Sequence, residues 1–280
     1  MQYESAATSE VALCLLRDAG GDAKVVAGGT NVVPNLRDRI IQPKLLIDIN
    51  RIPSFRGINA KIDSVQLKPN CTISDLIRSP ELTDGARLLP LAAEWFAGPS
   101  IRNRATIAGN IVDASPAADI SVPLLALDAE IEVSRSDNAP RLIPIRQFLT
   151  GPHQTRLLHD ELVTAIRIQR FKGARVAYYK YARRDSLAIS IVSLAVLVEL
   201  SGSVCRRARI AVGAASPVPY RAIQAEEALQ GEELSATNIS RAARLAREEA
   251  RPISDIRGSA AYRLELVEVL LRRLLEQLAG

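Results

Sequence analysis

A short apolar run that ends in two glycines constrains the fold of the N-terminal part of the chain. Residues 24–27 have the composition of a buried strand, and the small polar stretch 28–31, Gly-Gly-Thr-Asn, follows at once. We predict a helix over residues 9–18 and a second helix or a turn over residues 33–39. Another strand is predicted over residues 44–49. The order helix, strand, glycine turn, helix, strand indicates a small α/β unit with a parallel strand pair.

The remaining sequence divides at about Arg170. Before this point, alternating segments over residues 55–67 predict antiparallel strands, and an apolar helix is predicted over residues 86–97. Beyond it, the segments 175–184 and 187–200 are strand-rich, although the second also allows a helix. Two long helices are predicted over residues 238–249 and 259–278, because Ala, Leu, Glu and Arg dominate there at helical spacing.

Composition excludes several classes of protein. No apolar run approaches the roughly 20 residues that cross a bilayer, and the N-terminus lacks a basic region followed by an apolar core, so we expect a cytoplasmic protein. The three cysteines lie far apart and the only two histidines, His153 and His159, have no metal-site pattern near them. We therefore expect no disulfide framework and no metal bound by this chain. The net charge of +5 is too mild and scattered for a nucleic-acid-binding protein.

Two loops carry the same chemical character. Gly28-Gly29 after a strand suits an ordinary tight turn, or a backbone that must approach a phosphate closely. In the second loop, residues 102–110, a short strand-like piece meets Gly109 between Thr106 and Asn110, whose side chains can donate to a ligand or cap their own turn. The Rossmann and P-loop glycine patterns are both absent. Two such loops can clamp a pyrophosphate from both sides.

The amino-acid sequences of three segments resemble those of a known family. The segments VVAGGTNVVPNLR, AEWFAGPSIRNRATIAGNIVDASPAAD and DELVTAIRI are similar to the FAD-binding (medium) subunit of the xanthine dehydrogenase and aerobic carbon monoxide dehydrogenase family of molybdenum hydroxylases. The C-terminal segments ARIAVGAASPVPYRA and EARPISDIRGSAAYRLELVEVLLRRLL look like the same family's C-terminal flavoprotein domain. The resemblance runs from end to end.

The resemblance implies an α+β fold with two domains. Residues 1–170 would form an FAD-binding domain of the vanillyl-alcohol-oxidase (PCMH) type, with subdomains of about 1–54 and 55–170. Residues 171–280 would form a carbon monoxide dehydrogenase flavoprotein C-terminal-like domain, with a small antiparallel sheet and a helical bundle.

The resemblance also implies which residues bind FAD. The two glycine loops would approach the cofactor, Phe96 would lie against it, and Asp119 would hold its polar groups. Lys180 would stabilise charge on reduced FAD if it lies near the flavin ring, whereas without the resemblance it reads as a solvated strand lysine. The full set is Val26, Ala27, Gly28, Gly29, Thr30, Asn31, Phe96, Thr106, Ile107, Ala108, Gly109, Asn110, Asp119, Leu162 and Lys180. No catalytic residue is expected in this chain.

Three departures from the family's pattern matter. Ala108 replaces the first glycine of the usual T-I-G-G-N loop, which is tolerable only if its φ angle is negative. Asn31 stands where an acidic residue or serine is common. The inserted iron–sulfur loop of the 4-hydroxybenzoyl-CoA reductase β subunit is absent, which favours the other branches of the family.

The implied function is electron transfer by a subunit of a heterotrimeric molybdenum hydroxylase. FAD would be this chain's cofactor, with molybdopterin in a large partner subunit and [2Fe–2S] clusters in a small one, and a dimer of heterotrimers is expected. Residues 259–278 carry more apolar positions than one helix face needs, which indicates bundle packing and, with nearby arginines, a partner interface. The alternatives are a stand-alone FAD-dependent reductase or oxidase of the same fold, or a subunit that has lost FAD. The sequence identifies neither the hydroxylated substrate nor the terminal electron acceptor.

Overall fold

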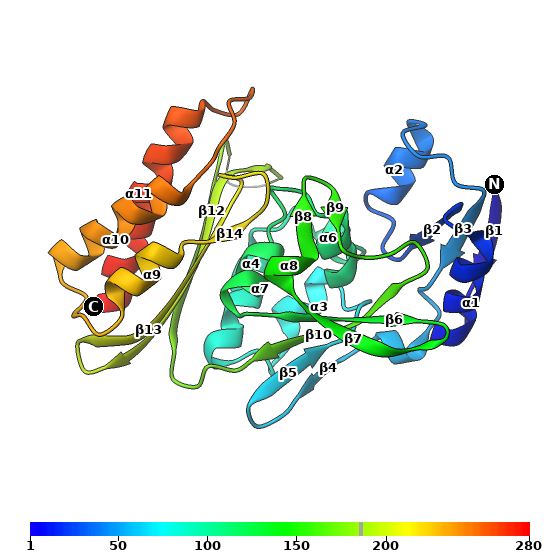
Figure 1. Cartoon of the computed structure of the whole chain (residues 1–280), viewed down its shortest axis with the longest axis horizontal. Coiled ribbons are helices and arrows are strands. Elements are labelled where there is room, and N and C mark those ends of the chain that lie inside the picture. The colour runs from blue at the N-terminus through cyan, green and yellow to red at the C-terminus, as the bar shows by residue number, and fades with distance from the viewer. Residues whose placement is uncertain (185–186) are drawn as a thin grey trace.

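The computed structural model describes residues 1–184 and 187–280, and its three main sheets follow one another along the long axis of the molecule (Figure 1). The first sheet has the strand order β1-β3-β2 with parallel pairing, as expected for the strands on either side of the glycine turn. Strand β1 was not predicted, because all four of its residues are exposed and carry no apolar pattern. The elements of this unit are β1 (Gln2–Ser5), α1 (Ser9–Ala19), β2 (Ala23–Val26), α2 (Val32–Arg37) and β3 (Leu45–Asp48).

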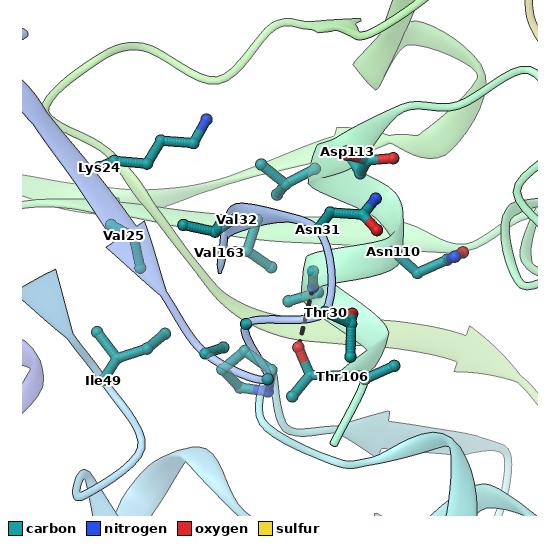
Figure 2. A pocket seen from close by; sticks show the side chains of 18 of the residues that line it. Lys24, Val25, Thr30, Asn31, Val32, Ile49, Thr106, Asn110, Asp113 and Val163 are labelled. Carbon is teal, nitrogen blue, oxygen red and sulfur yellow. Dashed lines mark hydrogen bonds between the residues drawn. The ribbon is translucent and has the colours of Figure 1, made fainter. Parts of the chain in front are cut away.

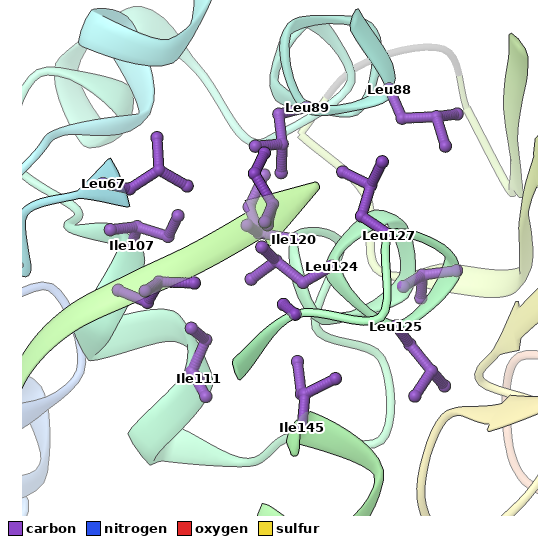
Figure 3. Packing of buried hydrophobic residues seen from close by; sticks show 14 of the residues in the cluster. Leu67, Leu88, Leu89, Ile107, Ile111, Ile120, Leu124, Leu125, Leu127 and Ile145 are labelled. Carbon is purple, nitrogen blue, oxygen red and sulfur yellow. The ribbon is translucent and has the colours of Figure 1, made fainter. Parts of the chain in front are cut away.

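The second sheet has five antiparallel strands in the order β4-β5-β10-β6-β7. Helices α3 to α7 and a large apolar core cover it, with Ile107, Ile111, Ile120 and Leu124 among the fully buried side chains (Figure 3). Its elements are η1 (Pro53–Phe55), β4 (Ile58–Ala60), β5 (Ser64–Leu67), α3 (Ile73–Arg78), η2 (Asp84–Arg87), α4 (Leu88–Glu94), α5 (Pro99–Arg102), α6 (Ile107–Asp113), α7 (Ser121–Ala126), β6 (Glu130–Arg135), β7 (Asn138–Pro144), α8 (Ile145–Phe148), β8 (Leu149–Gly151), β9 (Gln154–Thr155) and β10 (Leu162–Gln169).

The strand-like piece predicted before Gly109 is wrong. Thr106 is instead the N-cap of α6, and its hydroxyl accepts a hydrogen bond from the Gly109 N–H at 3.1 Å. Thr106 followed by Ile107 has the composition of a strand. A threonine can equally be the N-cap of a helix, where its hydroxyl accepts a hydrogen bond from the N–H three residues later. Residues 107–109 are therefore helical.

The third sheet is antiparallel and lies between two cores. Its order is β11-β12-β13-β14, and helices α9 to α11 cover one face (Figure 1). Leu194 and Val196 on β12 pack toward these helices, whereas Ala195 and Leu197 join the core of the second sheet. This burial on both faces explains the mostly apolar sequence of β12, and no part of the predicted segment 187–200 is helical. The elements are β11 (Arg175–Ala182), β12 (Ser190–Ser201), β13 (Val204–Gly213), β14 (Tyr220–Arg221), α9 (Ile223–Leu229), α10 (Ala236–Glu249) and α11 (Ala260–Ala279).

The broad apolar surface of α11 is used inside the chain. Seven of its apolar residues are buried in the core shared with α10 and β12: Leu266, Val267, Leu270, Leu271, Leu274, Leu275 and Leu278. Bundle packing thus accounts for this surface, and α11 leaves no apolar stripe for a partner among its described residues. No helix in the parts of the chain that the structure describes is long and apolar enough to cross a membrane.

A buried arginine fixes the start of α11 to the third sheet. The Arg263 side chain is 2% exposed and donates to the carbonyl oxygens of Ile191 and Ala214 and to Oδ1 of Asp255 at 2.7 Å. Burial opposes ionisation of Asp255, but the hydrogen bonds from Arg257 and the charges of Arg263 and Arg257 outweigh it and lower the pKa of Asp255 to about 2. The carboxylate therefore stays ionised and paired with the buried guanidinium.

We predict that Arg263→Met destabilises the protein by about 3–5 kcal/mol, because it removes the buried donor of two carbonyls and one of the two arginines that hold Asp255. Chemical denaturation measures the change. Arg273→Met is the matched control, since Arg273 lies on the same helix with its side chain exposed, and it should change stability by no more than about 0.5 kcal/mol. Equal stability of the two variants would show that the Arg263 network contributes nothing.

Candidate functional site

A cleft lies between the first α/β unit and the second sheet (Figure 2). The turn after β2, one face of α6 and the start of β10 form its walls. Eleven of the fifteen predicted site residues line it: Ala27, Gly28, Gly29, Thr30, Asn31, Phe96, Thr106, Ala108, Gly109, Asn110 and Leu162. The fold thus brings the two loops, which are about seventy-five positions apart in sequence, to the same cavity.

The first loop offers a row of free backbone donors. The N–H groups of Gly28, Gly29, Thr30 and Asn31 have no acceptor in the described part of the chain. Gly29 has a φ angle of 73°, a conformation that favours glycine, so the backbone can turn here without strain. Consecutive free N–H groups in a turn are suited to binding an anion such as a pyrophosphate.

Gly28 has a different and more local reason to be glycine. A Cβ atom at this position would lie 1.9 Å from the carbonyl oxygen of Arg104 and 3.1 Å from the Cα of Ala105. The absent side chain therefore lets the first loop rest directly on the backbone that leads into the second. The two loops are joined by this contact before any ligand is considered.

The helical amides of the second loop are already bonded. The N–H of Ile107 donates to Cys71, that of Ala108 to Pro69, and that of Gly109 to the Thr106 hydroxyl. Of the amides of residues 106–109, only that of Thr106 has no acceptor in the described part of the chain. The second loop therefore offers a ligand mainly its side chains and its shape.

Asn110 supplies the polar side chain of the second loop. Its Oδ1 is buried and has no hydrogen-bond partner among the described residues, and Asn110 lines the same cleft as Thr30 and Asn31 (Figure 2). Buried polar atoms are rarely left unpaired, so this oxygen fits a ligand that donates to it. Ala108 lies within α6 and does not have a positive φ angle. Its methyl group therefore causes no backbone strain.

Four predicted residues do not line the cleft. Val26 and Ile107 are buried in the cores of their domains. Lys180 is buried rather than solvated, and its Nζ donates to Oδ2 of Asp119 at 2.7 Å, while the Ser190 hydroxyl donates to Oδ1 at 2.8 Å. Burial raises the pKa of Asp119, and Lys180 partly offsets this effect.

Sequence reasoning missed other lining residues, among them Lys24, Asn35, Asp113 and Glu161. The Glu161 carboxylate is held by two hydrogen bonds from Arg141, at 3.0 and 2.9 Å, and is already satisfied. Lys24 and Asp113 face the cavity from opposite walls (Figure 2). No glycine or cap marks these positions in the sequence; only their places on β2 and α6 bring them to the cleft.

The donor set of the cleft suits a dinucleotide. Free amides stand on one wall, an unpaired amide oxygen on the other, and apolar side chains from Ile49, Phe96 and Leu162 lie between. Within the described residues, no group of three or more His, Cys, Asp or Glu side chains could hold a metal ion.

Comparisons with known proteins agree with this chemistry. Residues 1–169 match the family described as the FAD binding domain in molybdopterin dehydrogenase, and residues 177–278 match the carbon monoxide dehydrogenase flavoprotein C-terminal domain. The chain is 34% identical to the 6-hydroxypseudooxynicotine dehydrogenase complex subunit alpha of Paenarthrobacter nicotinovorans, over 98% of this chain and 92% of that one. It is 33% identical to the putative xanthine dehydrogenase FAD-binding subunit of Escherichia coli, over 98% and 94%. The carbon monoxide dehydrogenase structure from Hydrogenophaga pseudoflava superposes with a TM-score of 0.95 at 33% identity, covering 99% of this chain and 96% of that one.

We predict that Gly28→Ala separates the two loops and strongly lowers FAD content, because a methyl group cannot occupy the position 1.9 Å from the Arg104 oxygen. Such overpacking costs about 1–3 kcal/mol of stability. Flavin per chain after purification and the denaturation midpoint measure both effects. Gly202→Ala is the control, since no atom lies within 4 Å of a Cβ added in this distant hairpin; its φ of 62° costs some stability, but the variant should retain its FAD. Full FAD in Gly28→Ala would contradict the contact.

Proposed function

Because the chain belongs to the family of FAD-binding subunits of molybdenum hydroxylases, we propose that it is the electron-transfer subunit of a heterotrimeric enzyme of this kind. It receives electrons from [2Fe–2S] clusters of a partner and passes them to an external acceptor. The single observation that carries the proposal is the row of four free N–H groups in a cleft of the family's FAD-binding domain. FAD supplies one- and two-electron redox chemistry at this position.

The two loops would hold the cofactor in different ways. The free N–H groups of residues 28–31 donate to the pyrophosphate oxygens, and the Thr30 hydroxyl adds a further donor. Asn110 accepts from the cofactor through its unpaired Oδ1. Thr106 and Ala108 shape the opposite wall, and Phe96 and Leu162 exclude water from the cleft.

The described lining of the cleft holds few groups for acid–base chemistry on a substrate. Glu161 is paired with Arg141, Lys24 and Asp113 stand on opposite walls, and neither a histidine nor a cysteine is among the lining residues. A stand-alone reductase or oxidase of the same fold would need proton donors beside its substrate. The composition of the walls thus favours a subunit that carries electrons over one that completes a reaction alone.

The names of two relatives support the proposal that this chain works with partner subunits. One is a subunit of a dehydrogenase complex, and another similar chain is the medium chain of carbon monoxide dehydrogenase from Hydrogenophaga pseudoflava. We accordingly assign this chain a large molybdopterin subunit and a small [2Fe–2S] subunit as partners, with two heterotrimers joined by two-fold symmetry.

The same proposal divides the chain near Arg170, into an FAD-binding domain over 1–170, with subdomains of about 1–54 and 55–170, and a C-terminal domain over 171–280. The third sheet begins just after this point, at Arg175, and it separates the two large apolar cores.

We predict that acid or heat releases all of the FAD, because neither loop holds a histidine or cysteine that could be linked to the flavin. Flavin absorbance in the supernatant, against that of the precipitated chain, measures the release. Flavin that stays with the denatured chain would contradict non-covalent binding.

The function itself is tested by flavin reduction. In the assembled complex, the hydroxylation substrate should reduce the flavin and lower its absorbance at about 450 nm. In the isolated chain the same substrate should leave this absorbance unchanged. Dithionite, which reduces flavin in either preparation, is the control. Reduction of the isolated chain's FAD by that substrate would overturn the assignment as an electron-transfer subunit.

A further inference from the structure

The chain that leaves α4 carries four consecutive carbonyl groups with no backbone donor. These are the carbonyls of Glu94, Trp95, Phe96 and Ala97, and no backbone N–H group in the described parts of the chain donates to them. Ala97 has a φ angle of 33°, which is unfavourable for a residue with a side chain. A turn of this kind, with its carbonyl dipoles unpaired at the end of a helix, does not hold its shape unaided.

Two cationic side chains supply all the missing donors. The Arg102 guanidinium donates to the carbonyl oxygens of Phe96, Glu94 and Ala97 at 2.5, 2.6 and 3.0 Å. Lys180 donates to the remaining one, that of Trp95, at 3.2 Å. Every carbonyl of the turn is thus bound by a cation, and a rigid guanidinium fork suits three neighbouring acceptors better than an ammonium does.

Lys180 is itself held in place from the far side. Asp119 accepts from its Nζ at 2.7 Å, and Ser190 donates to the other carboxylate oxygen at 2.8 Å. The side chains of the ion pair are 4% and 8% exposed, so the pair is shielded from water and its geometry is well defined. The ammonium bridges Asp119 and the turn, and neither group of the pair lines the cleft.

The turn matters because Phe96 is the aromatic residue that lines the cleft. Its neighbour Trp95 packs edge-on against Tyr179 of β11, with ring centroids 5.5 Å apart. The N–H groups of Trp95 and Phe96 donate to carbonyls of α4, those of Ala92 and Ala93, whereas the carbonyls of the turn are held by the two cations. The far side of the turn, and with it the position of the Phe96 ring, therefore depends on Arg102 from α5 and on Lys180 from the third sheet.

We propose that Arg102 and the Lys180–Asp119 pair are positioning residues, which hold the Glu94–Ala97 turn so that Phe96 forms one wall of the cofactor cleft. The inference rests on the proposed function only in taking FAD as the occupant of the cleft. Lys180 and Asp119 then act on the cofactor through the turn rather than by touching it. Docking of the third sheet also becomes a condition for a complete cleft, because β11 carries Lys180.

The chain's single tryptophan, Trp95, lies in the turn and reports on it without any cofactor. We compare Arg102→Met with the wild type in the FAD-free chain by acrylamide quenching of tryptophan fluorescence. Loss of the three hydrogen bonds should raise the quenching constant toward that of the unfolded chain. The quenching constant of Arg102→Lys should lie between those of the wild type and Arg102→Met, since an ammonium replaces only part of the guanidinium's hydrogen bonds. Arg104→Met is the matched control, because Arg104 is exposed two residues away and should quench as the wild type does.

The link to Phe96 is tested in the FAD-loaded protein. Arg102→Met should weaken FAD binding roughly tenfold, because the expected loss of binding free energy is comparable with that of one charge-assisted hydrogen bond. It should also alter the visible circular dichroism of the flavin, and Arg102→Lys should restore part of both. In a Phe96→Leu background, Arg102→Met should add little, because both changes remove the same wall.

Three results would overturn the inference. These are wild-type quenching in both Arg102 variants, unchanged FAD affinity in Arg102→Met, or full additivity of Arg102→Met with Phe96→Leu. Wild-type protein that binds no FAD would instead contradict the proposed function, while the quenching experiment would still decide whether the cations hold the turn.

Discussion

The contact between Gly28 and the Arg104 carbonyl is the constraint on which the cleft depends. The first loop belongs to a small parallel sheet and the second to a helix above an antiparallel sheet, so no shared hydrogen-bond ladder joins them. Their backbones meet because one side chain is missing. A pocket between two separately built units is sensitive to such a contact, since a shift of about 1 Å in either wall is enough to spoil the geometry of a bound ligand.

A second constraint acts at the other end of the cleft and is electrostatic. Arg102 and Lys180 replace the donors that a regular element would have provided to the turn bearing Phe96. Burying a cation is costly unless it is paired, and Asp119 supplies the pairing for Lys180. The third sheet thus takes part in building a site that lies mainly in the first two.

The sequence was sufficient for elements with a strong local pattern. The parallel strands around the glycine turn, the capped helix α1 and the long helices α10 and α11 were predicted correctly. It failed where tertiary contacts decide: β1 has no apolar pattern, and Thr106 begins a helix rather than ending a strand. The role of Lys180 could not be predicted from its neighbours, because its partners lie 61 and 85 positions away.

The two loops also differ in how they can respond to substitution. In the second loop the helical amides are already bonded, so its wall is set by protein contacts and exists without a ligand. In the first loop four amides have no protein acceptor among the described residues. A bound anion would accept their hydrogen bonds, so these amides contribute to ligand binding rather than to the stability of the empty cleft. Changes in the first loop should therefore appear mainly in cofactor affinity. Changes around Thr106 should appear in stability first, and in affinity only because the wall has moved.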